Sequence, residues 1–361
     1  MAEHLRDEEH CDVAYVGAPD SLEERLAGEA GMEFHAVPAK GFDRGAPLSL
    51  VSAALTTVLS LPTCLGVLRR TRPEVVIGFG GYVSLPLGLA AAMAGIPLVL
   101  HEQNAVPGMT NKLLSRWART VCVTYATSVD RLAHPSRAFV TGNPVRSAVA
   151  RADRAAGRKV LKLRKADLVL LVFGGSRGAR HLNTAMLSLY KRLKDIPKLR
   201  IIHVAGPAEI ESVSESLKAL APEADGFWRA LGYIEAMGDA LAAADLVVCR
   251  AGATTLAELA ALGRPSVLVP YPYATDDHQA LNATALVAAG AASTIPDVEL
   301  DTQAFGDEIV RLLTDSKTRA DMAASAHALA RPMAAHAVAE AAIEAAVERR
   351  RILGVPAKDA L

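Results

Sequence analysis

The feature that most constrains the fold is a repeated alternation of short apolar runs with longer segments of helical length. The run Leu168–Phe173 is apolar at every position, as expected for a strand of a parallel sheet buried on both faces. Alternating strands and helices indicate doubly wound α/β sheets. The predicted strands are Asp12–Gly17, Glu33–Pro38, Val75–Gly78, Pro97–His101, Thr120–Thr124, Ala138–Thr141, Leu168–Phe173, Leu199–Val204, Leu231–Ile234, Leu246–Cys249 and Ser266–Pro270.

A polar, basic segment, Arg151–Lys165, interrupts this pattern near the middle of the chain, and we interpret it as the joint between two domains. The length of 361 residues also favours two domains of ordinary size. We therefore predict a first domain over residues 1–150 and a second over 151–361, two Rossmann-like halves facing a cleft. The Ala- and Glu-rich segment Ala334–Arg351 is expected to form a long helix that could return to the first domain.

Composition narrows the class of protein. The chain has 39 basic and 39 acidic residues, which argues against a dedicated nucleic-acid binder. Hydrophobic residues make up 51% of the chain, which excludes a disordered protein. The polar, acidic start of the chain does not resemble a signal peptide. The scattered cysteines predict neither a disulfide framework nor a zinc site and suit a reducing cytoplasm: they are Cys11, Cys64, Cys122 and Cys249.

One uncharged stretch, Ala46–Leu68, is long enough to cross a bilayer and is followed by Arg69, Arg70 and Arg72. Its serines and threonines and an internal Pro62 make it only moderately hydrophobic. Three interpretations stay open: a membrane span, a buried core helix, and a helix on the membrane surface with a basic flank.

The clearest motif is the glycine loop FGGSRGAR, which contains Gly174, Gly175, Ser176 and Gly178 and follows the apolar strand Leu168–Phe173. Glycines allow a ligand to approach the backbone closely, and the start of the following helix offers free N–H groups to a phosphate. The alternative is a tight strand-to-helix turn. The loop matches neither a P-loop nor GxGxxG.

Three further motifs lie in the first half. A second glycine loop, GFGGYVS, contains Gly80 and Gly81. The polar run HEQN, from His101 to Asn104, follows a buried strand at the end where ligands bind in open α/β sheets. Arg146, in GNPVR, could pair with a diphosphate. For the glycine loop the alternative is an ordinary turn. For HEQN it is a polar loop whose histidine forms hydrogen bonds within the protein, and for Arg146 it is an arginine exposed on the surface.

Two motifs of the second half have the chemistry of nucleotide and sugar binding. In CRAGATTLAE, Glu258 lies about one turn into a helix and could accept hydrogen bonds from a ribose diol, or it could be a first-turn acid stabilised by the helix dipole. In DDHQALN, His278, Gln279 and Asn282 could bind sugar hydroxyls. Asp276 and the acid after it lack a third ligand at usable spacing, so no metal is predicted.

Taken in order, GFGGYVS, HEQN, GNPVR, GGSRGAR, CRAGATTLAE and DDHQ resemble the MurG family of undecaprenyl-diphospho-muramoylpentapeptide N-acetylglucosaminyltransferases. The resemblance implies the GT-B fold and inverting transfer of GlcNAc from UDP-GlcNAc to the C4 hydroxyl of MurNAc in lipid I. The product would be lipid II, a precursor of peptidoglycan and hence of cell shape and division. No cofactor is implied.

The resemblance also implies roles for individual residues. Ser176 and its glycine loop would hold the diphosphate or the donor sugar, and Arg146 would neutralise the diphosphate with help from Thr255. Glu258 would bind the ribose. The remaining substrate contacts would be Ile234 at uracil through its backbone, His278 and Gln279 at the GlcNAc hydroxyls, and Asn104 near the donor sugar and acceptor.

One departure from the family pattern concerns catalysis. The family begins with a strand and a GGTGGH loop, whose His is a candidate general base, and the chain has no such loop. The catalytic residue is therefore unassigned, with His101 as the nearest substitute. Two explanations stay open. In the first, the start is wrongly assigned or the gene is truncated, and the loop is therefore missing from this sequence. In the second, the short chain is genuine, and it either uses another base or is an inactive UDP-GlcNAc binder. Another GT-B enzyme, such as a UDP-GlcNAc 2-epimerase, is the further alternative.

The family resemblance bears on location and partners. It implies a peripheral protein on the cytoplasmic face of the bacterial cell membrane, where lipid I is found. The expected partners are UDP-GlcNAc, lipid I, the inner face of that membrane and other cell-wall synthesis proteins, with no nucleic acid.

Overall fold

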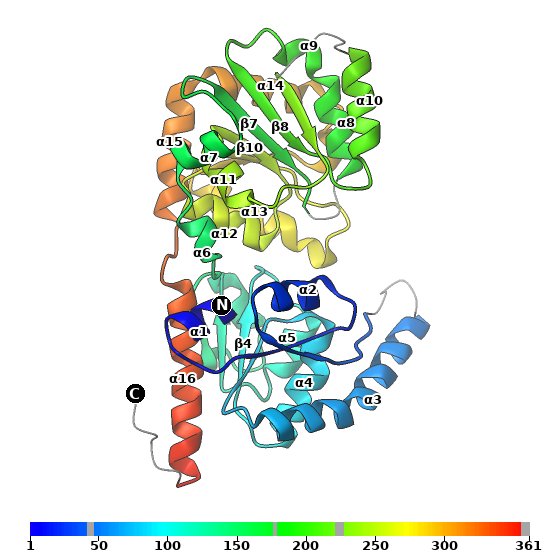
Figure 1. Cartoon of the computed structure of the whole chain (residues 1–361), viewed down its shortest axis with the longest axis vertical. Coiled ribbons are helices and arrows are strands. Elements are labelled where there is room, and N and C mark those ends of the chain that lie inside the picture. The colour runs from blue at the N-terminus through cyan, green and yellow to red at the C-terminus, as the bar shows by residue number, and fades with distance from the viewer. Residues whose placement is uncertain (42–46, 176–178, 221–226, 355–361) are drawn as a thin grey trace. The chain divides into compact units, whose positions relative to one another are not determined.

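The computed structural model describes residues 1–41, 47–175, 179–220 and 227–354 (Figure 1). The chain divides into two compact units, one made of Met1–Pro144 with Met333–Leu361, the other of Val145–Pro332. The elements of the first unit are α1 (Ala2–Asp7), β1 (Ala14–Gly17), α2 (Leu22–Glu29), β2 (Glu33–Ala36), α3 (Pro47–Thr71), β3 (Val76–Gly78), α4 (Gly81–Met93), β4 (Leu98–Glu102), α5 (Met109–Leu114), β5 (Thr120–Val123), η1 (Ala126–Arg131), η2 (Pro135–Arg137), β6 (Ala138–Val140) and α16 (Ala334–Ile352).

The second unit contains the larger sheet. Its elements are α6 (Ser147–Ala150), α7 (Arg154–Val160), β7 (Leu168–Phe173), α8 (Arg180–Ser188), α9 (Tyr190–Leu193), β8 (Leu199–Val204), α10 (Ile210–Leu220), β9 (Trp228–Leu231), α11 (Met237–Ala243), β10 (Leu246–Cys249), α12 (Ala253–Ala261), β11 (Ser266–Leu268), η3 (Thr275–Asp277), α13 (His278–Ala288), β12 (Ala292–Thr294), η4 (Asp297–Glu299), α14 (Gln303–Thr314) and α15 (Ser316–Ala328).

All six strands of the second unit are parallel, in the order β12-β11-β10-β7-β8-β9. Alternate residues of the central strand β7 enter two different cores, because successive side chains point to opposite faces of a sheet. Val169 and Leu171 pack with α11 and α12, whereas Leu170 and Val172 pack with α8 and α14. The sheet is therefore buried on both faces, and the prediction of a doubly wound parallel sheet is confirmed.

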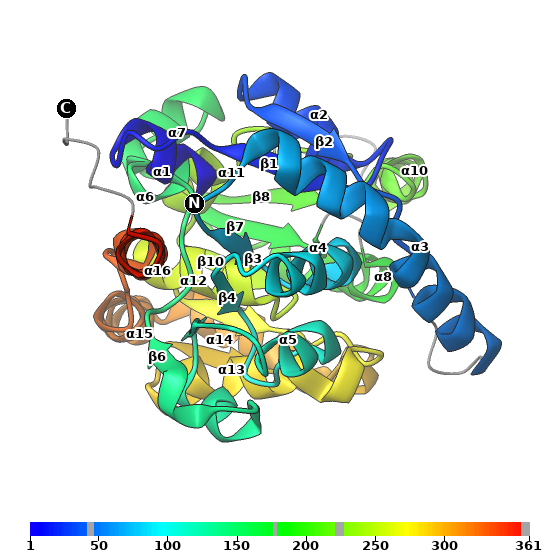
Figure 2. The same cartoon turned by 90° about the horizontal axis from the view of Figure 1, so that it is seen from below.

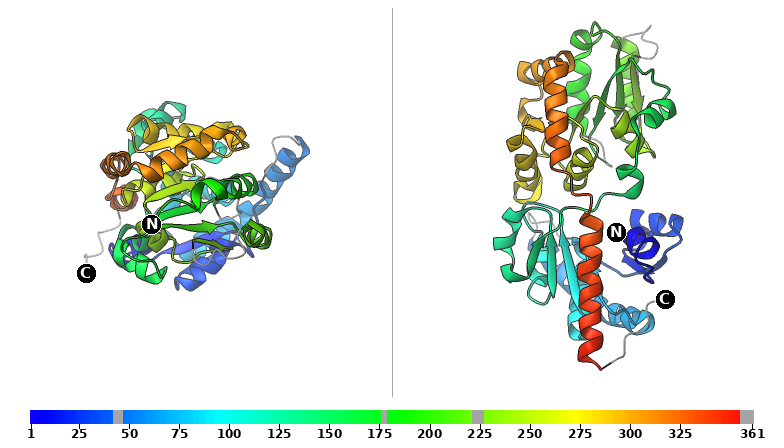
Figure 3. Two further views of the ribbon diagram at one scale, coloured as in Figure 1. Left: turned by 90° about the horizontal axis from the view of Figure 1, so that it is seen from above. Right: turned by 90° about the vertical axis from the view of Figure 1, so that its left-hand side faces the viewer.

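The strands of the first unit form two sheets among the described residues, β1-β2 and β3-β4-β5-β6, both parallel. Leu98 and Leu100 of β4 face a core shared with α3, α4 and α5. Val99, between them, faces the last helix, α16, and packs with Val338 and Ala342. Figure 3 shows α16 running beside these strands. The last helix thus completes the first unit rather than the second.

Two expectations about the second unit are wrong. The predicted strand Leu231–Ile234 lies too late, since β9 covers Trp228–Leu231. The segment Arg151–Lys165 is not a linker, because it contains helix α7. A Cβ atom at Gly157 would lie 2.3 Å from the carbonyl oxygen of Asp239 in α11, so α7 is docked closely on that helix. The units instead divide after Pro144.

Helix α3 contains the apolar stretch whose role the sequence left open. It lies beside α4 (Figure 2), and its residues Cys64, Val67 and Leu68 are buried in the core of the first unit. The segment Val51–Thr71 meets the length and hydropathy expected of a membrane span, with 28% of it buried. Because one side of the helix packs in the core, α3 is an integral part of the first unit.

Candidate functional site

The second unit contains a topological switch point between β7 and β10. In chain order these are the first and fourth strands of the sheet, and they lie next to each other with Phe173 opposite Cys249. In open α/β sheets, ligands bind outside the carboxyl ends of the strands at such a point. The two loops that leave these strands are the ones that the sequence analysis selected as phosphate and ribose contacts.

The loop after β7 begins with Gly174 and Gly175. Gly175 has a φ of +93°, a conformation that a residue with a side chain rarely adopts. Ser176 and Gly178, two predicted diphosphate contacts, lie outside the described residues. Helix α8 follows, so its N-terminus lies at the edge of the sheet where β7 ends.

The loop after β10 leads into α12 through Gly252, which is the N-cap residue and makes no side-chain cap. The first N–H groups of a helix have no partner within the helix, so those of α12 can bind an anion. Thr255 is half-buried in this first turn, and its hydroxyl oxygen lies 3.9 Å from where a Cβ atom at Gly252 would be. The turn can hold a phosphate or a similar oxyanion.

Glu258 and Arg146 form an ion pair in the second unit. Arg146 precedes α6 and donates from Nη2 to Oε1 of Glu258, at 3.1 Å. The Glu258 side chain is 6% exposed and that of Arg146 is 61% exposed. Burial raises the pKa of the Glu258 carboxyl, and Arg146 opposes that rise. The site therefore holds a largely buried carboxylate and a cation that is free to turn toward solvent.

The loop after β11 contains the predicted sugar contacts. Gln279 accepts a hydrogen bond at Oε1 from the backbone N–H of Tyr271, at 2.9 Å, which leaves its amide N–H groups as donors. His278 begins α13, with Nδ1 2.8 Å from the carbonyl oxygen of Thr275. Asp276 and Asp277 both have a φ of +52°, so the turn before α13 is strained. Such strain is common at ligand-binding loops.

An arginine that the sequence analysis did not select supports this loop. Arg250, at the end of β10, is 9% exposed and donates to the carbonyl oxygens of Val269 and Pro270, at 3.3 and 3.2 Å. It also pairs with Asp297 at 2.5 Å, and Asp297 lies 2.7 Å from Nδ1 of His181 in α8. This network joins the loops after β10, β11 and β12 to α8. Its members are too far apart in sequence for any spacing rule to find them.

Ile234, the predicted uracil contact, lies in the loop between β9 and α11. Its side chain is partly buried and packs, like those of Leu231 and Met237, against the core that contains Leu241. Because the side chain is held by the core, the backbone groups of this loop are the ones available to a base.

In the first unit, Gly80 and Gly81 begin α4 with φ values of +78° and +76°. Glu102, at the end of β4, is buried and accepts hydrogen bonds from the backbone N–H of Asn104 at 2.9 Å and from Nδ2 of Asn111 at 2.8 Å. Asn104 is half-buried beside it. Glu102 therefore fixes the loop that carries Asn104.

His101 does not have the geometry of a general base. Its side chain is fully buried, and burial lowers its pKa to about 4. The neutral ring can donate from Nε2 to the carbonyl oxygen of Gly142, at 3.0 Å, and accept at Nδ1 from Nε2 of Gln103, at 3.2 Å. A base must reach the proton that it removes. With both nitrogens engaged inside the protein, His101 has a structural role.

Comparison with known proteins identifies relatives over nearly the whole chain. The family models of the glycosyltransferase family 28 N-terminal and C-terminal domains match residues 1–123 and 169–340. A UDP-N-acetylglucosamine–N-acetylmuramyl-(pentapeptide) pyrophosphoryl-undecaprenol N-acetylglucosamine transferase from Desulforudis audaxviator is 41% identical over 326 residues, which cover 90% of this chain and 87% of that protein. A protein of the same name from Halothermothrix orenii is 39% identical over 327 residues, with 90% and 88% covered.

Solved structures agree with the fold. MurG from Acinetobacter baumannii aligns with a TM-score of 0.72 and 30% identity, over 95% of this chain and 94% of that one. A UDP-GlcNAc 2-epimerase from Neisseria meningitidis, solved with UDP-GlcNAc, aligns with a TM-score of 0.63 over 93% and 91% of the two chains. At 13% identity the second likeness concerns the fold alone.

Proposed function

Because this chain belongs to the MurG family of N-acetylglucosamine transferases, a GT-B family of glycosyltransferase family 28, we propose that it moves GlcNAc from UDP-GlcNAc to the N-acetylmuramyl-pentapeptide of pyrophosphoryl-undecaprenol. The product is lipid II. The relatives support the transferase over the 2-epimerase alternative, whose likeness is in the fold alone.

The observation that carries the proposal is the buried carboxylate of Glu258 beside the switch point of the second unit. A buried carboxylate is costly unless it is paired or hydrogen-bonded. Its ion-pair partner among the described residues, Arg146, is mostly exposed and able to leave. A ribose diol is a suitable replacement, since its two hydroxyls can donate to the two oxygens of one carboxylate.

The transfer step needs a stabilised leaving group. The acceptor hydroxyl oxygen forms a bond to the anomeric carbon of GlcNAc while the bond from that carbon to the diphosphate of UDP breaks. Negative charge then grows on the diphosphate. The N-terminal turn of α12, the glycine loop with Ser176 and the guanidinium of Arg146 are the groups that we assign to that charge. The hydroxyl proton passes to a base other than His101.

The sugar contacts are assigned to the loop after β11. Gln279 keeps two amide N–H donors for GlcNAc hydroxyls, because its carbonyl oxygen already accepts from Tyr271. His278 contributes Nε2 from the first residue of α13. On the acceptor side we assign Asn104, whose loop is held by Glu102.

The test is GlcNAc transfer by the purified 361-residue chain from UDP-GlcNAc to a lipid I analogue. Lipid II formation that depends on the acceptor is the expected result. Binding of UDP-GlcNAc without product would instead identify a non-catalytic nucleotide-sugar binder. Formation of the 2-epimer without acceptor would identify an epimerase. Either result would overturn the proposal.

We also propose that the first unit binds the surface of an anionic membrane through α3. The exposed side chains Val51, Leu55, Val58 and Leu59 recur at helical spacing and form an apolar stripe. Arg69 and its neighbours give the end of the helix positive charge. An apolar stripe with a basic flank is typical of helices that lie in the membrane interface.

Vesicle binding tests the membrane proposal. The double variant Leu55→Glu/Leu59→Glu should lose co-sedimentation with vesicles containing phosphatidylglycerol, because two charges enter the apolar stripe. Both side chains are more than half exposed, so the fold should be retained. Val298→Glu, at a 79% exposed position of the second unit, is the matched control and should bind as the parent chain does. Equal binding of the double variant and the control would contradict the proposal.

A further inference from the structure

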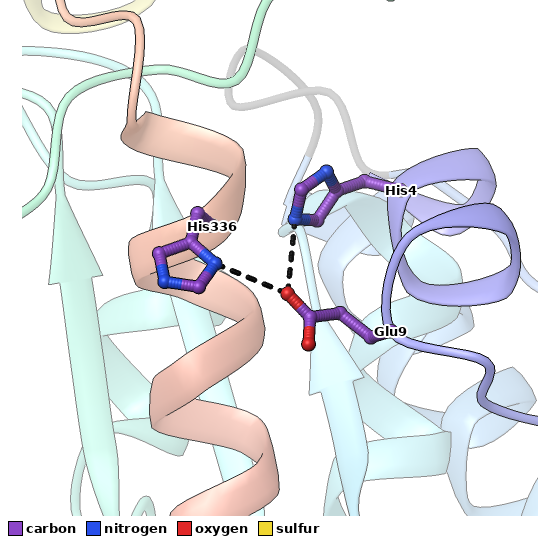
Figure 4. A group of neighbouring side chains, drawn as sticks. All are labelled: His4, Glu9 and His336. Carbon is purple, nitrogen blue, oxygen red and sulfur yellow. Dashed lines mark hydrogen bonds and ion pairs between the residues drawn. The ribbon is translucent and has the colours of Figure 1, made fainter.

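The first unit brings together three potential metal ligands from the two ends of the chain. His4 belongs to α1, Glu9 follows that helix, and His336 lies in the first turn of α16. Figure 4 shows both imidazole rings turned toward the carboxylate of Glu9. One ligand atom from each residue lies within 4.8 Å of the other two. The cluster belongs to the first unit, whereas the residues that we assign to nucleotide binding belong to the second.

The distances agree with a single coordination sphere. Oε1 of Glu9 lies 3.3 Å from Nε2 of His4 and 3.1 Å from Nδ1 of His336. In a tetrahedral zinc site, metal–ligand bonds of about 2.0–2.2 Å place neighbouring ligand atoms about 3.3–3.5 Å apart. The two distances from the carboxylate therefore differ from those in a zinc site by only a few tenths of an ångström, and the two imidazole nitrogens lie within 4.8 Å of each other.

The hydrogen bonding of the cluster is incomplete without such an ion. Nδ1 of His336 forms a hydrogen bond with Glu9. Nε2 of His4 is buried and has no hydrogen-bond partner, although the carboxylate is near. A buried polar nitrogen without a partner is costly, and a bound cation would satisfy it.

We propose that His4, Glu9 and His336 bind a divalent transition-metal ion such as Zn²⁺. Two imidazole nitrogens and one carboxylate oxygen suit Zn²⁺, Co²⁺ or Ni²⁺, whereas Mg²⁺ and Ca²⁺ prefer oxygen ligands. Water completes the sphere. The ion joins α1 to α16, two helices whose sequences lie more than 300 residues apart, and stabilises the first unit by binding the folded state.

The test uses the full chain without an affinity tag, stripped with a chelator and titrated with Co²⁺ and then Zn²⁺. Co²⁺ bound by three protein ligands and water should give visible absorption bands that saturate at one ion per chain. Zn²⁺ should displace it and raise the melting temperature. Mg²⁺ should do neither. Failure of Co²⁺ and Zn²⁺ to bind in this ratio would overturn the proposal.

Variants assign the ligands. His336→Gln removes an exposed ligand, so it should fold normally and weaken Co²⁺ binding by more than about tenfold, the size of effect expected when a metal site is damaged. Glu9→Gln should weaken binding similarly. The control is His10→Asn, which removes an exposed histidine of the same segment that is outside the cluster. If His336→Gln and His10→Asn bind Co²⁺ equally well, the ion is held elsewhere and the assignment is wrong.

Discussion

Replacing Glu258 by Gln should weaken UDP-GlcNAc binding while stabilising the protein. The substitution keeps the volume of the side chain of a residue that is 4% exposed and replaces one carboxylate oxygen by an amide group. Loss of a hydrogen bond to a charged group costs about 1.5–3 kcal/mol. Since every 1.4 kcal/mol changes an equilibrium constant tenfold, the dissociation constant should rise by roughly 10- to 150-fold.

The same substitution should weaken UDP-GlcNAc binding but stabilise the folded protein. Burial raises the pKa of Glu258, so between its unfolded and folded pKa values the folded state binds more protons than the unfolded state. The stability of the parent chain therefore falls as pH rises through that window, from the ordinary glutamate pKa of 4.5 upward. Gln does not titrate, so the variant avoids this loss. It should match or exceed the parent chain in stability at pH near 7, and its advantage should shrink as the solution is acidified.

Two measurements check this reasoning: calorimetric titration with UDP-GlcNAc, and urea unfolding at an acidic and a neutral pH. Glu215→Gln, an exposed acid on α10, is the control and should change neither quantity. An unchanged dissociation constant in a folded Glu258→Gln variant would refute the ribose assignment. Reduced stability at neutral pH would refute the argument from burial.

Three further outcomes are expected. Arg146→Ala should lower kcat by about 10²–10³-fold and the affinity for UDP-GlcNAc much less, because a group that stabilises developing charge acts in the transition state; steady-state kinetics would contradict this if only KM changed. His101→Gln should cost about 1–3 kcal/mol of stability above pH 6.5 and less toward pH 4, because in that window the histidine of the unfolded parent chain binds a proton that the buried ring does not; urea unfolding measures this, and loss of transfer by the folded variant would show a catalytic role instead. Amides of β1 and β2 should exchange hydrogen faster than those of β7, because the former strands are partly exposed and, among the described residues, pair only with each other; equal protection would contradict this.

In the second unit the sequence predicted the central strands well and the edge strands poorly. Leu168–Phe173, Leu199–Val204 and Leu246–Cys249 have the predicted bounds, because strands buried on both faces are largely apolar. The edge strand β9 contains Arg229, and the other edge strand, Ala292–Thr294, was not predicted. Edge strands have a neighbour on one side only, so their composition is less constrained and their pattern is weaker.

The basic segment taken for a linker shows why charge alone misleads. Arg154 and Arg158 of α7 both pair with Asp245, at 2.5 and 2.9 Å, and Arg158 is 5% exposed. Asp245 also accepts from the backbone N–H of Val169 in β7, at 2.7 Å. A run of cations usually marks a solvated surface, but here one acid, 91 and 87 residues away, pairs with two of the cations. The sequence pattern does not contain that pairing.

The sequence can predict sites built from loops that follow strands, but not sites built from residues far apart in the chain. Glycine loops and helix starts that follow strands can be read locally, because parallel strands bring their carboxyl ends to one edge whatever the loops contain. This is why Gly175 and Glu258 could be selected before the fold was known. The pairing of Glu258 with Arg146 spans 112 residues, and the cluster of Glu9 with His336 spans 327. Contacts of that kind follow only from packing, so the sites that depend on them become visible only in the folded chain.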